Sequence, residues 1–174
     1  MMPRFKLTIV TTIFSLLLAA TPVRALHLGY GIGISWGTDT NEADTVVREP
    51  RGVPGIISLG TTGDIGILAV RTDLELQILD PFIGFGMGTY LHYSMFDSKL
   101  SPYIGIAVGY ISEHYGYYSK WKLVPEYAAG FEIHRSETRS VGLEYRYISG
   151  DFRFDDTIIS NKTNMVMFRF RYVI

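Results

Sequence analysis

Apolar and polar side chains alternate strictly along the last ten residues of the chain, 165–174. One side carries Val166, Phe168, Phe170, Tyr172 and Ile174, and the other carries Met165, Met167, Arg169, Arg171 and Val173. Successive side chains of a β-strand point in opposite directions, so this segment is predicted to be a strand with an apolar face and a largely cationic face. An apolar face of this size needs a large apolar surface to cover it, and we predict that lipid covers it.

The same alternation recurs in seven upstream segments, namely 26–37, 53–61, 67–79, 82–93, 102–112, 123–134 and 140–149. Except in the shorter piece at 53–61, the face opposite the bulky apolar residues is either glycine-rich, as at Gly29, Gly31 and Gly33, or charged. A soluble sandwich or lipocalin-like barrel would show the reverse, with bulky groups inside and charges facing water. The pattern therefore predicts an all-β fold: an eight-stranded antiparallel up-and-down transmembrane β-barrel.

The connections between these segments predict which end of the barrel is which. Tight turns are expected at 62–64 and 135–138, and long polar loops at 38–52, 113–120 and 150–163. Short turns belong on the periplasmic rim and long loops outside the cell. Two connections fit this rule less well, a very short outer loop at 80–81 and a long inner turn at 94–101, so either the barrel is uneven or the register shifts there.

The N-terminal segment has the layout of a secretory signal peptide. Arg4 and Lys6 precede an apolar run over 7–20, and the chain then reads Thr-Pro-Val-Arg-Ala to Ala25. We expect cleavage after Ala25, which leaves residues 26–174 as one barrel domain. The alternative, a single transmembrane anchor, is disfavoured because the run is short and Pro22 ends it.

Composition narrows the function classes. The chain has no Cys, which excludes a disulfide scaffold, thiolate metal sites and thiol nucleophiles. Its net charge of -1 gives no reason to expect nucleic acid as a partner. We expect no cofactor and no metal site, since the paired acids Glu42 with Asp44, and Asp151 with Asp155 and Asp156, match no calcium-loop spacing.

The charged residues of the inward faces are expected to form one network. A lumen of eight strands is filled by side chains, and an unpaired charge there is costly. The expected members are Arg71, Asp73, Glu75, Glu126, Glu132, Glu144, Arg146, Arg169 and Arg171. The alternative for the same residues is a porin-like ion path, which long paired side chains in so narrow a lumen disfavour.

Aromatic residues near the strand ends are expected to lie at the lipid headgroups, namely Trp36, Tyr93, Tyr110, Trp121 and Tyr172. The predicted loop at 113–120 is unusually rich in Tyr. It is therefore a candidate contact surface for another cell, a sugar or lipopolysaccharide, although strand extensions above a membrane also carry such residues.

The signal peptide, the eight alternating segments and the aromatic final strand resemble the small outer-membrane β-barrel superfamily of Gram-negative bacteria. This resemblance covers the whole mature chain. It implies an outer-membrane location, contact with outer-membrane lipids and lipopolysaccharide, and insertion by the barrel assembly machinery. That machinery reads a final Phe or Trp in the family, whereas this chain ends in Ile174 and keeps only the alternation.

A narrower resemblance concerns catalysis. The stretch 142–150, followed by a polar loop and a terminal strand, is similar to the end of the lipid A deacylase barrels, which carry a His-x-Ser pair and a later acid. Ser149 matches their nucleophile, but Tyr147 stands in place of the base and Asn161 in the neighbourhood of the acid. A serine without a neighbouring imidazole is a poor nucleophile at neutral pH.

Two functions follow from the sequence. The favoured one is a non-enzymatic barrel with a structural role or a surface-interaction role through its outer loops. The alternative is a lipid-modifying acyl hydrolase at the lipid-facing rim. The four His residues, His27, His92, His114 and His134, form no triad spacing with a Ser and an acid, so the sequence leans against an enzyme.

Overall fold

The computed structural model describes residues 25–49, 51–65, 68–79, 82–95, 99–115, 118–154 and 157–174. They form the strands β1 (Ala25–Thr40), β2 (Val46–Arg48), β3 (Arg51–Gly52), β4 (Gly55–Ile65), β5 (Leu68–Leu79), β6 (Phe82–Tyr93), β7 (Leu100–Tyr115), β8 (Tyr118–Ser136), β9 (Arg139–Phe154) and β10 (Thr157–Val173). Within these ranges no helix is long and apolar enough to cross a membrane. Residues 1–24 of the predicted signal peptide lie outside the described residues. Its last residue, Ala25, is the first residue of β1.

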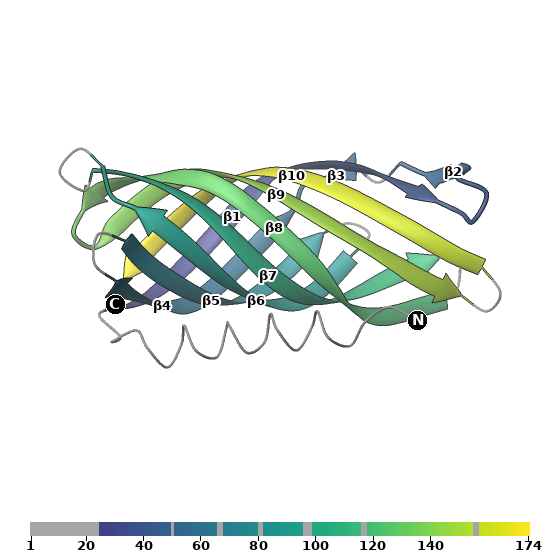
Figure 1. Ribbon diagram of the computed structural model, residues 1–174, viewed down its shortest axis with the longest axis horizontal. Helices are drawn as coiled ribbons and strands as arrows, with labels where there is room; N and C mark the ends of the chain where they lie inside the picture. Colours follow the sequence, from purple (N-terminus) through teal and green to yellow (C-terminus); the bar gives the residue numbers. More distant parts are fainter. Residues whose placement is uncertain are drawn as a thin grey trace.

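The strands close into a barrel. From β4 to β10 each strand pairs antiparallel with the next, β4 also pairs with β1, and β10 returns to β1 from His27↔Val173 to Thr40↔Ser160. Figure 1 shows β10 beside β1, with the short β2 and β3 as additions to β1. The predicted eight-stranded antiparallel barrel is therefore confirmed.

The stagger of the strands sets the width of the barrel. Following paired residues once round the barrel from Trp36 leads back to Leu26 on the same strand, an offset of ten residues (36 less 26). Strand number and stagger together determine the tilt and diameter of a barrel. Eight strands enclose a space that side chains can fill.

The two ends of the barrel differ. We call the end that carries Ala25, Ile174 and the β4–β5, β6–β7 and β8–β9 connections the inner end, and the opposite end the outer end. At the outer end the β7–β8 hairpin extends beyond β6, and the β9–β10 hairpin extends beyond the last β8–β9 pair, Glu126↔Ile148. Figure 1 shows this uneven rim at the right-hand side. We call these two projecting hairpins the outer extension.

Several predicted connections are wrong. Residues 62–64 belong to β4, whose pairing with β5 continues to Ile65↔Leu68. Most of 113–120 and of 150–163 continues the strands, with only 116–117 and 155–156 between them, and 38–52 includes the end of β1 together with β2 and β3. The inner turn is shorter than 94–101, because Met95 bridges to Leu100. The short connection expected at 80–81 lies outside the described residues.

The outer extension resembles loops in the sequence because its polarity is inverted. Along the lipid-facing part of β9, Tyr145 points outward and Arg146 inward, whereas beyond Ile148 the apolar Phe152 points inward and the charged Asp151 points outward. A strand surrounded by water needs its apolar side chains inside, and a strand surrounded by lipid needs them outside. The period of 2 persists, but the face that carries the apolar residues changes.

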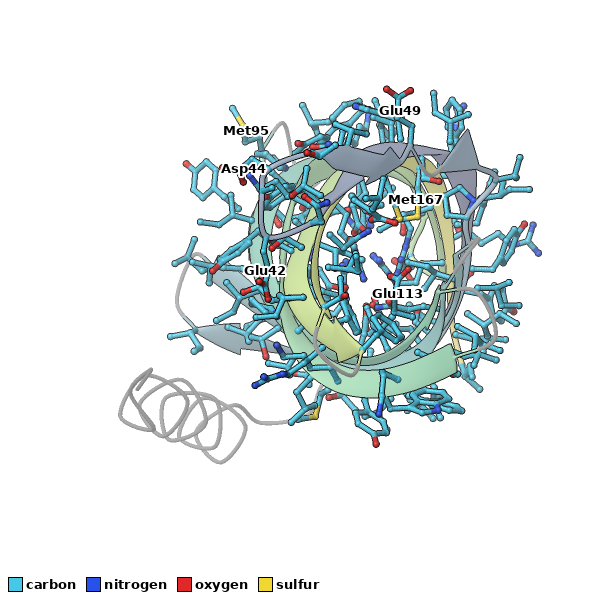
Figure 2. All side chains as sticks on the ribbon, turned by 90° about the vertical axis from the view of Figure 1, so that its right-hand side faces the viewer. Glu42, Asp44, Glu49, Met95, Glu113 and Met167 are labelled. Atoms are coloured by element: carbon cyan, nitrogen blue, oxygen red, sulfur yellow. The ribbon has the colours of Figure 1, made fainter. Side chains whose placement is uncertain are left out.

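Below the outer extension the outward faces are apolar around the whole barrel. Ile104 is 65% exposed and Phe168 57% exposed, and they belong to a belt contributed by all eight long strands. Figure 2, viewed from the outer end, shows side chains projecting outward on every side while Met167 and Glu113 point into the lumen. Exposed apolar residues in a continuous belt are typical of a surface covered by lipid.

Glycine at position 33 permits the close approach of β1 and β10. A Cβ placed there would collide with the carbonyl oxygen of Val166 and lie 2.7 Å from Met167 Cα. We expect Gly33→Ala to lower the free energy of unfolding by about 1–3 kcal/mol through overpacking. Denaturant unfolding of the folded barrel in detergent measures this. Gly55→Ala is the control, because a Cβ at Gly55 meets nothing within 4 Å; an equal loss in both variants would contradict the packing argument.

Candidate functional site: the filled lumen

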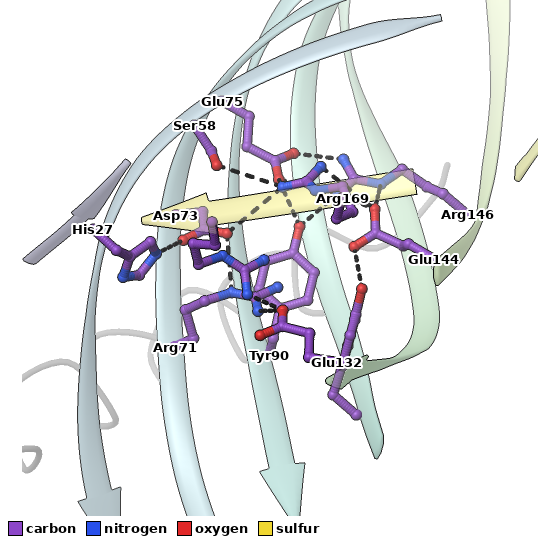
Figure 3. Close-up of polar contacts among 12 residues, drawn as sticks. His27, Ser58, Arg71, Asp73, Glu75, Tyr90, Glu132, Glu144, Arg146 and Arg169 are labelled. Carbon is purple, nitrogen blue, oxygen red and sulfur yellow. Dashed lines mark hydrogen bonds and ion pairs between the residues drawn. The ribbon is translucent and has the colours of Figure 1, made fainter. Parts of the chain in front are cut away.

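The lumen contains all nine charged residues that the sequence assigned to an interior network, and each of them is buried. They come from β5, β8, β9 and β10 and are shared among four arginines and five carboxylates. Side chains alternate along a strand, and these residues lie on the same side of the sheet as the glycine-rich faces of the neighbouring strands. Each therefore points into the lumen. Figure 3 shows most of them in contact across the lumen.

Arg146 is the centre of the network. Its guanidinium lies 2.5 Å from Glu75, 2.8 Å from Glu126 and 2.9 Å from Glu144, measured between nitrogen and carboxylate oxygen. It also donates to the hydroxyl of Tyr90 at 2.6 Å. The arginine is fully buried. Three carboxylates from three different strands therefore meet at one cation.

Arg169 links this centre to the inner half of the lumen. Its guanidinium lies 3.3 Å from Glu75, 3.6 Å from Glu144 and 3.9 Å from Asp73. Asp73 in turn lies 3.0 Å from Arg71 Nε. The ion pairs are therefore continuous from β9 through β10 to β5.

Four uncharged or weakly charged residues also belong to the network, although selection by formal charge does not find them. Tyr90 donates to Glu75 at 2.8 Å, Tyr103 donates to Glu144 at 2.8 Å, Gln77 donates to Glu126 at 3.0 Å, and His27 Nε2 lies 2.6 Å from Asp73. The signal in the sequence is strand parity, since each has the inward parity of its strand.

Tyr90 explains why glycines line this part of the wall. A Cβ on Gly88 would lie 2.7 Å from the Tyr90 hydroxyl, and a Cβ on Gly105 would overlap the Tyr90 ring. Two cations lie close to the ring, Arg71 at 4.2 Å from its centroid and Arg146 at 6.0 Å. The small side of β6 and β7 therefore makes room for a large side chain of the same face.

An apolar layer closes the lumen above the ionic network, and the sequence pattern did not predict it. It consists of Ile56, Ile111, Val124, Ile148, Phe152, Phe154, Ile159, Met165 and Met167, all at most 4% exposed. Several of these residues come from segments that were predicted to be outer loops. The lumen thus has an ionic inner layer and an apolar outer layer.

The aromatic residues expected at the headgroups all lie on the outward face. Trp36, Tyr93, Tyr110, Trp121 and Tyr172 are between 41% and 48% exposed. Tyr110 and Trp121 stack at 5.2 Å between ring centroids on neighbouring strands, and Tyr30 stacks on Phe170 at 4.8 Å. Stacked amphipathic rings on a lipid-facing wall are typical of the membrane interface.

The residues matched to a hydrolase are not brought together. Ser149 and Tyr147 lie on outward positions of β9, where Ser149 pairs with Lys162 of β10. Asn161, at the expected acid position, is 1% exposed, points into the lumen and donates to Asp39 at 2.5 Å. The wall of the barrel separates the amide from the serine.

The remaining candidates show no common site. Glu42 and Asp44 are exposed between β1 and β2, Asp151 accepts a hydrogen bond from Ser160 at 2.7 Å, and Asp155 and Asp156 lie outside the described residues. Among the described residues no three His, Cys or acidic side chains cluster as metal ligands would. In the Tyr-rich segment 113–120, residues 116–117 lie outside the described residues. Glu113, at the start of this segment, is buried in the lumen.

The chain resembles solved structures but matches no protein-family model and no curated protein. The crystal structure of Neisserial surface protein A (NspA) is similar with a TM-score of 0.60 and 13% identity, over 88% of this chain and 99% of that one. A structure from the de novo design of transmembrane β-barrels and the N-terminal β-barrel domain of Pseudomonas aeruginosa OprF each give a TM-score of 0.49. Their identities are 12% and 8%, over 88% and 87% of this chain and 99% and 100% of theirs.

The likeness to the neisserial protein and the geometry of the barrel agree on the fold. At 13% identity the similarity to the neisserial protein concerns the fold alone. The closed antiparallel ladder leaves no strand edge exposed to lipid along the described membrane-facing part, and the outward belt is apolar. The chain therefore has the fold of a small eight-stranded transmembrane β-barrel.

Proposed function

We propose that this protein is an outer-membrane barrel closed to ions and solutes, which has a structural role or contacts the cell's surroundings through its outer extension. The observation that carries the proposal is the double closure of the lumen. A solute entering from outside meets the apolar layer around Met165 and Met167, and one entering from the inner end meets the ion pairs of Arg146. Conduction requires a continuous wet path, which neither layer provides.

The outer extension supplies the surface for contact. It projects beyond the belt on the β7–β8 and β9–β10 hairpins, and the outward side chains of the β9–β10 hairpin include the polar Asp151, Ser160 and Lys162. Its own interior is apolar, so the two hairpins are packed rather than freely moving. A packed polar projection suits binding, since little ordering entropy is lost on contact.

We expect lipopolysaccharide to be one partner at the outer rim. Lys162 is exposed there and pairs with Thr38, two residues along β1 from the outward-facing Trp36. Tryptophan lies preferentially at the headgroups, so a lysine next to it on the same face can reach the phosphates. During insertion we expect the barrel assembly machinery to recognise the alternating β10, which ends close to Ile174.

Conductance measurements test the closure. Purified barrel reconstituted in planar bilayers should give no stable conductance steps above baseline, because both layers of the lumen are filled. Insertion is checked on the same sample by heat-modifiable migration on a gel, and an open porin in the same bilayers is the positive control. Reproducible large steps from folded protein would overturn the proposal.

A further inference from the structure

A cavity of about 260 Å³ lies at the inner end of the lumen and is lined in part by members of the ionic network. Its polar lining includes His27, Arg71, His92, Glu132, Ser140 and Arg171, contributed by six different strands. The proposed function makes no use of this cavity. It lies at the inner end of the barrel, the end that carries Ala25 and Ile174.

Two arginines in the cavity share a single carboxylate oxygen. Arg71 Nη1 donates to Glu132 Oε1 at 2.6 Å, and Arg171 Nη1 donates to the same oxygen. The second oxygen of Glu132 already accepts from the hydroxyl of Ser140 at 3.2 Å. This carboxylate therefore has little capacity left for the other donors of the two guanidiniums.

Among the residues that the structure describes, three of those donors have neither a hydrogen-bond partner nor an ion-pair contact. They are Arg71 Nη2, Arg171 Nε and Arg171 Nη2. Arg71 is 1% exposed and Arg171 is 8% exposed, so both side chains are more than nine-tenths buried. A buried donor without an acceptor costs free energy, and two cations side by side increase that cost.

The histidines of the cavity do not supply the missing acceptors. Arginine has no lone pair to accept a hydrogen bond, so at the 2.8 Å contact between Arg71 Nη1 and His92 Nε2 the imidazole nitrogen is the acceptor and is already occupied. His27 Nε2 is engaged with Asp73 at 2.6 Å, and its Nδ1 lies 3.4 Å from the hydroxyl of Thr62. The cavity lining also includes Asp64, Glu137 and Arg139, so its carboxylates and arginines are equal in number. The unpaired donors beside Glu132 belong to the guanidinium groups of Arg71 and Arg171.

We propose that the inner cavity binds a small oxyanion, a carboxylate or a phosphate, between Arg71 and Arg171. Planar guanidinium groups match the paired oxygens of both anions and give short charge-assisted hydrogen bonds. The volume of about 260 Å³ admits such a group, either free or at the end of a longer molecule. Binding would satisfy the three free donors and offset the repulsion between the two arginines.

Calorimetric titration of the folded barrel in zwitterionic detergent tests this proposal, with inorganic phosphate and acetate as separate probes. Chloride replaces each anion to keep the ionic strength constant. We expect saturable binding of at least one probe. Tighter binding of phosphate would identify a phosphate-bearing ligand, and equal or tighter binding of acetate would identify a carboxylate. Heat with neither probe, or heat that never saturates, would show that water alone fills the cavity and would overturn the proposal.

A matched pair of variants locates the site. Arg171→Gln removes two of the free donors, so we expect binding to weaken about tenfold or more through the loss of a charge-assisted hydrogen bond. Arg135→Gln removes the same charge from an exposed position at the same end of the barrel, outside the cavity lining, and should leave binding unchanged. Equal loss in both variants would contradict a specific site.

Unsubstituted protein provides a second measurement, in case Arg171→Gln does not fold. In a nuclear magnetic resonance titration with the bound probe, we expect shifts concentrated at His92, Ser140 and Arg171. Ser160, at the outer end, should not shift. Shifts spread evenly over both ends of the barrel would overturn the assignment.

Discussion

Replacing Arg146 with Met is expected to lower the free energy of unfolding by about 3–5 kcal/mol, because it leaves buried carboxylates without their cation. Methionine fills much of the same volume, so the loss comes from charge. Glu75, Glu126 and Glu144 would remain in a fully buried layer without the guanidinium that they share. Arg169 lies 3.3 Å from Glu75 and 3.6 Å from Glu144, so it partly compensates these two carboxylates. It does not replace the contact that Arg146 makes with Glu126.

Urea unfolding of barrels folded into lipid, followed by heat-modifiable gel mobility, measures this effect. Arg135→Met is the control for a charge lost at an exposed position, and we expect it to change stability by less than about 0.5 kcal/mol. Adding Glu126→Gln to Arg146→Met should restore part of the stability, since one uncompensated charge is removed. If the double variant is no more stable than the single one, packing rather than charge accounts for the loss.

Phe168→Arg is the second large expected effect, a loss of about 2–4 kcal/mol. Phe168 is 57% exposed on β10. Along this strand it lies between Tyr172 and Asn164, and Asn164 pairs with Trp36; Tyr172 and Trp36 are two of the aromatic residues expected at the headgroups. It therefore lies near the middle of the apolar belt. An arginine there would place its charge in hydrocarbon, which solvates a cation poorly.

Folding into lipid vesicles at increasing urea concentrations tests this prediction and shows its dependence on depth. Ile174→Arg is the matched control, because Ile174 is also outward and exposed but lies at the end of the chain, where the cost is about 0–1 kcal/mol. A Phe168→Arg barrel as stable as the unsubstituted protein would mean that water, not lipid, covers this face.

Strand parity was the part of the fold that the sequence specified most directly. Because the side-chain period of a strand is two, a single bulky residue such as Phe168 orients the whole strand, and Arg169 and Arg171 then have to point inward. The same rule placed Glu144 and Arg146 in the lumen. It applies equally to Tyr90 and Tyr103, which a choice of interior residues by charge leaves out.

The outer extension could not be recognised by the same rule. Phe152 and Phe154 point inward and Asp151 outward, the opposite of the arrangement lower on β9. Polarity reports which side of a strand faces water, and that depends on where the membrane ends. A single sequence does not mark this height, so the polar outward residues of 150–163 resembled a loop.

Below the outer extension, the sequence by itself determined the solvent of each face, the number of long strands and the inward position of the charges, because all three follow from a period of two along one strand. Only the tertiary structure decided which charges meet. After one circuit of the barrel the pairing is offset by ten residues, and this stagger sets which inward positions lie at the same height. It brings Arg146 to Glu75 and places an apolar layer above them. It also leaves three donors without a partner on Arg71 and Arg171, two of the arginines that line the inner cavity, a consequence of contacts between strands far apart in the chain.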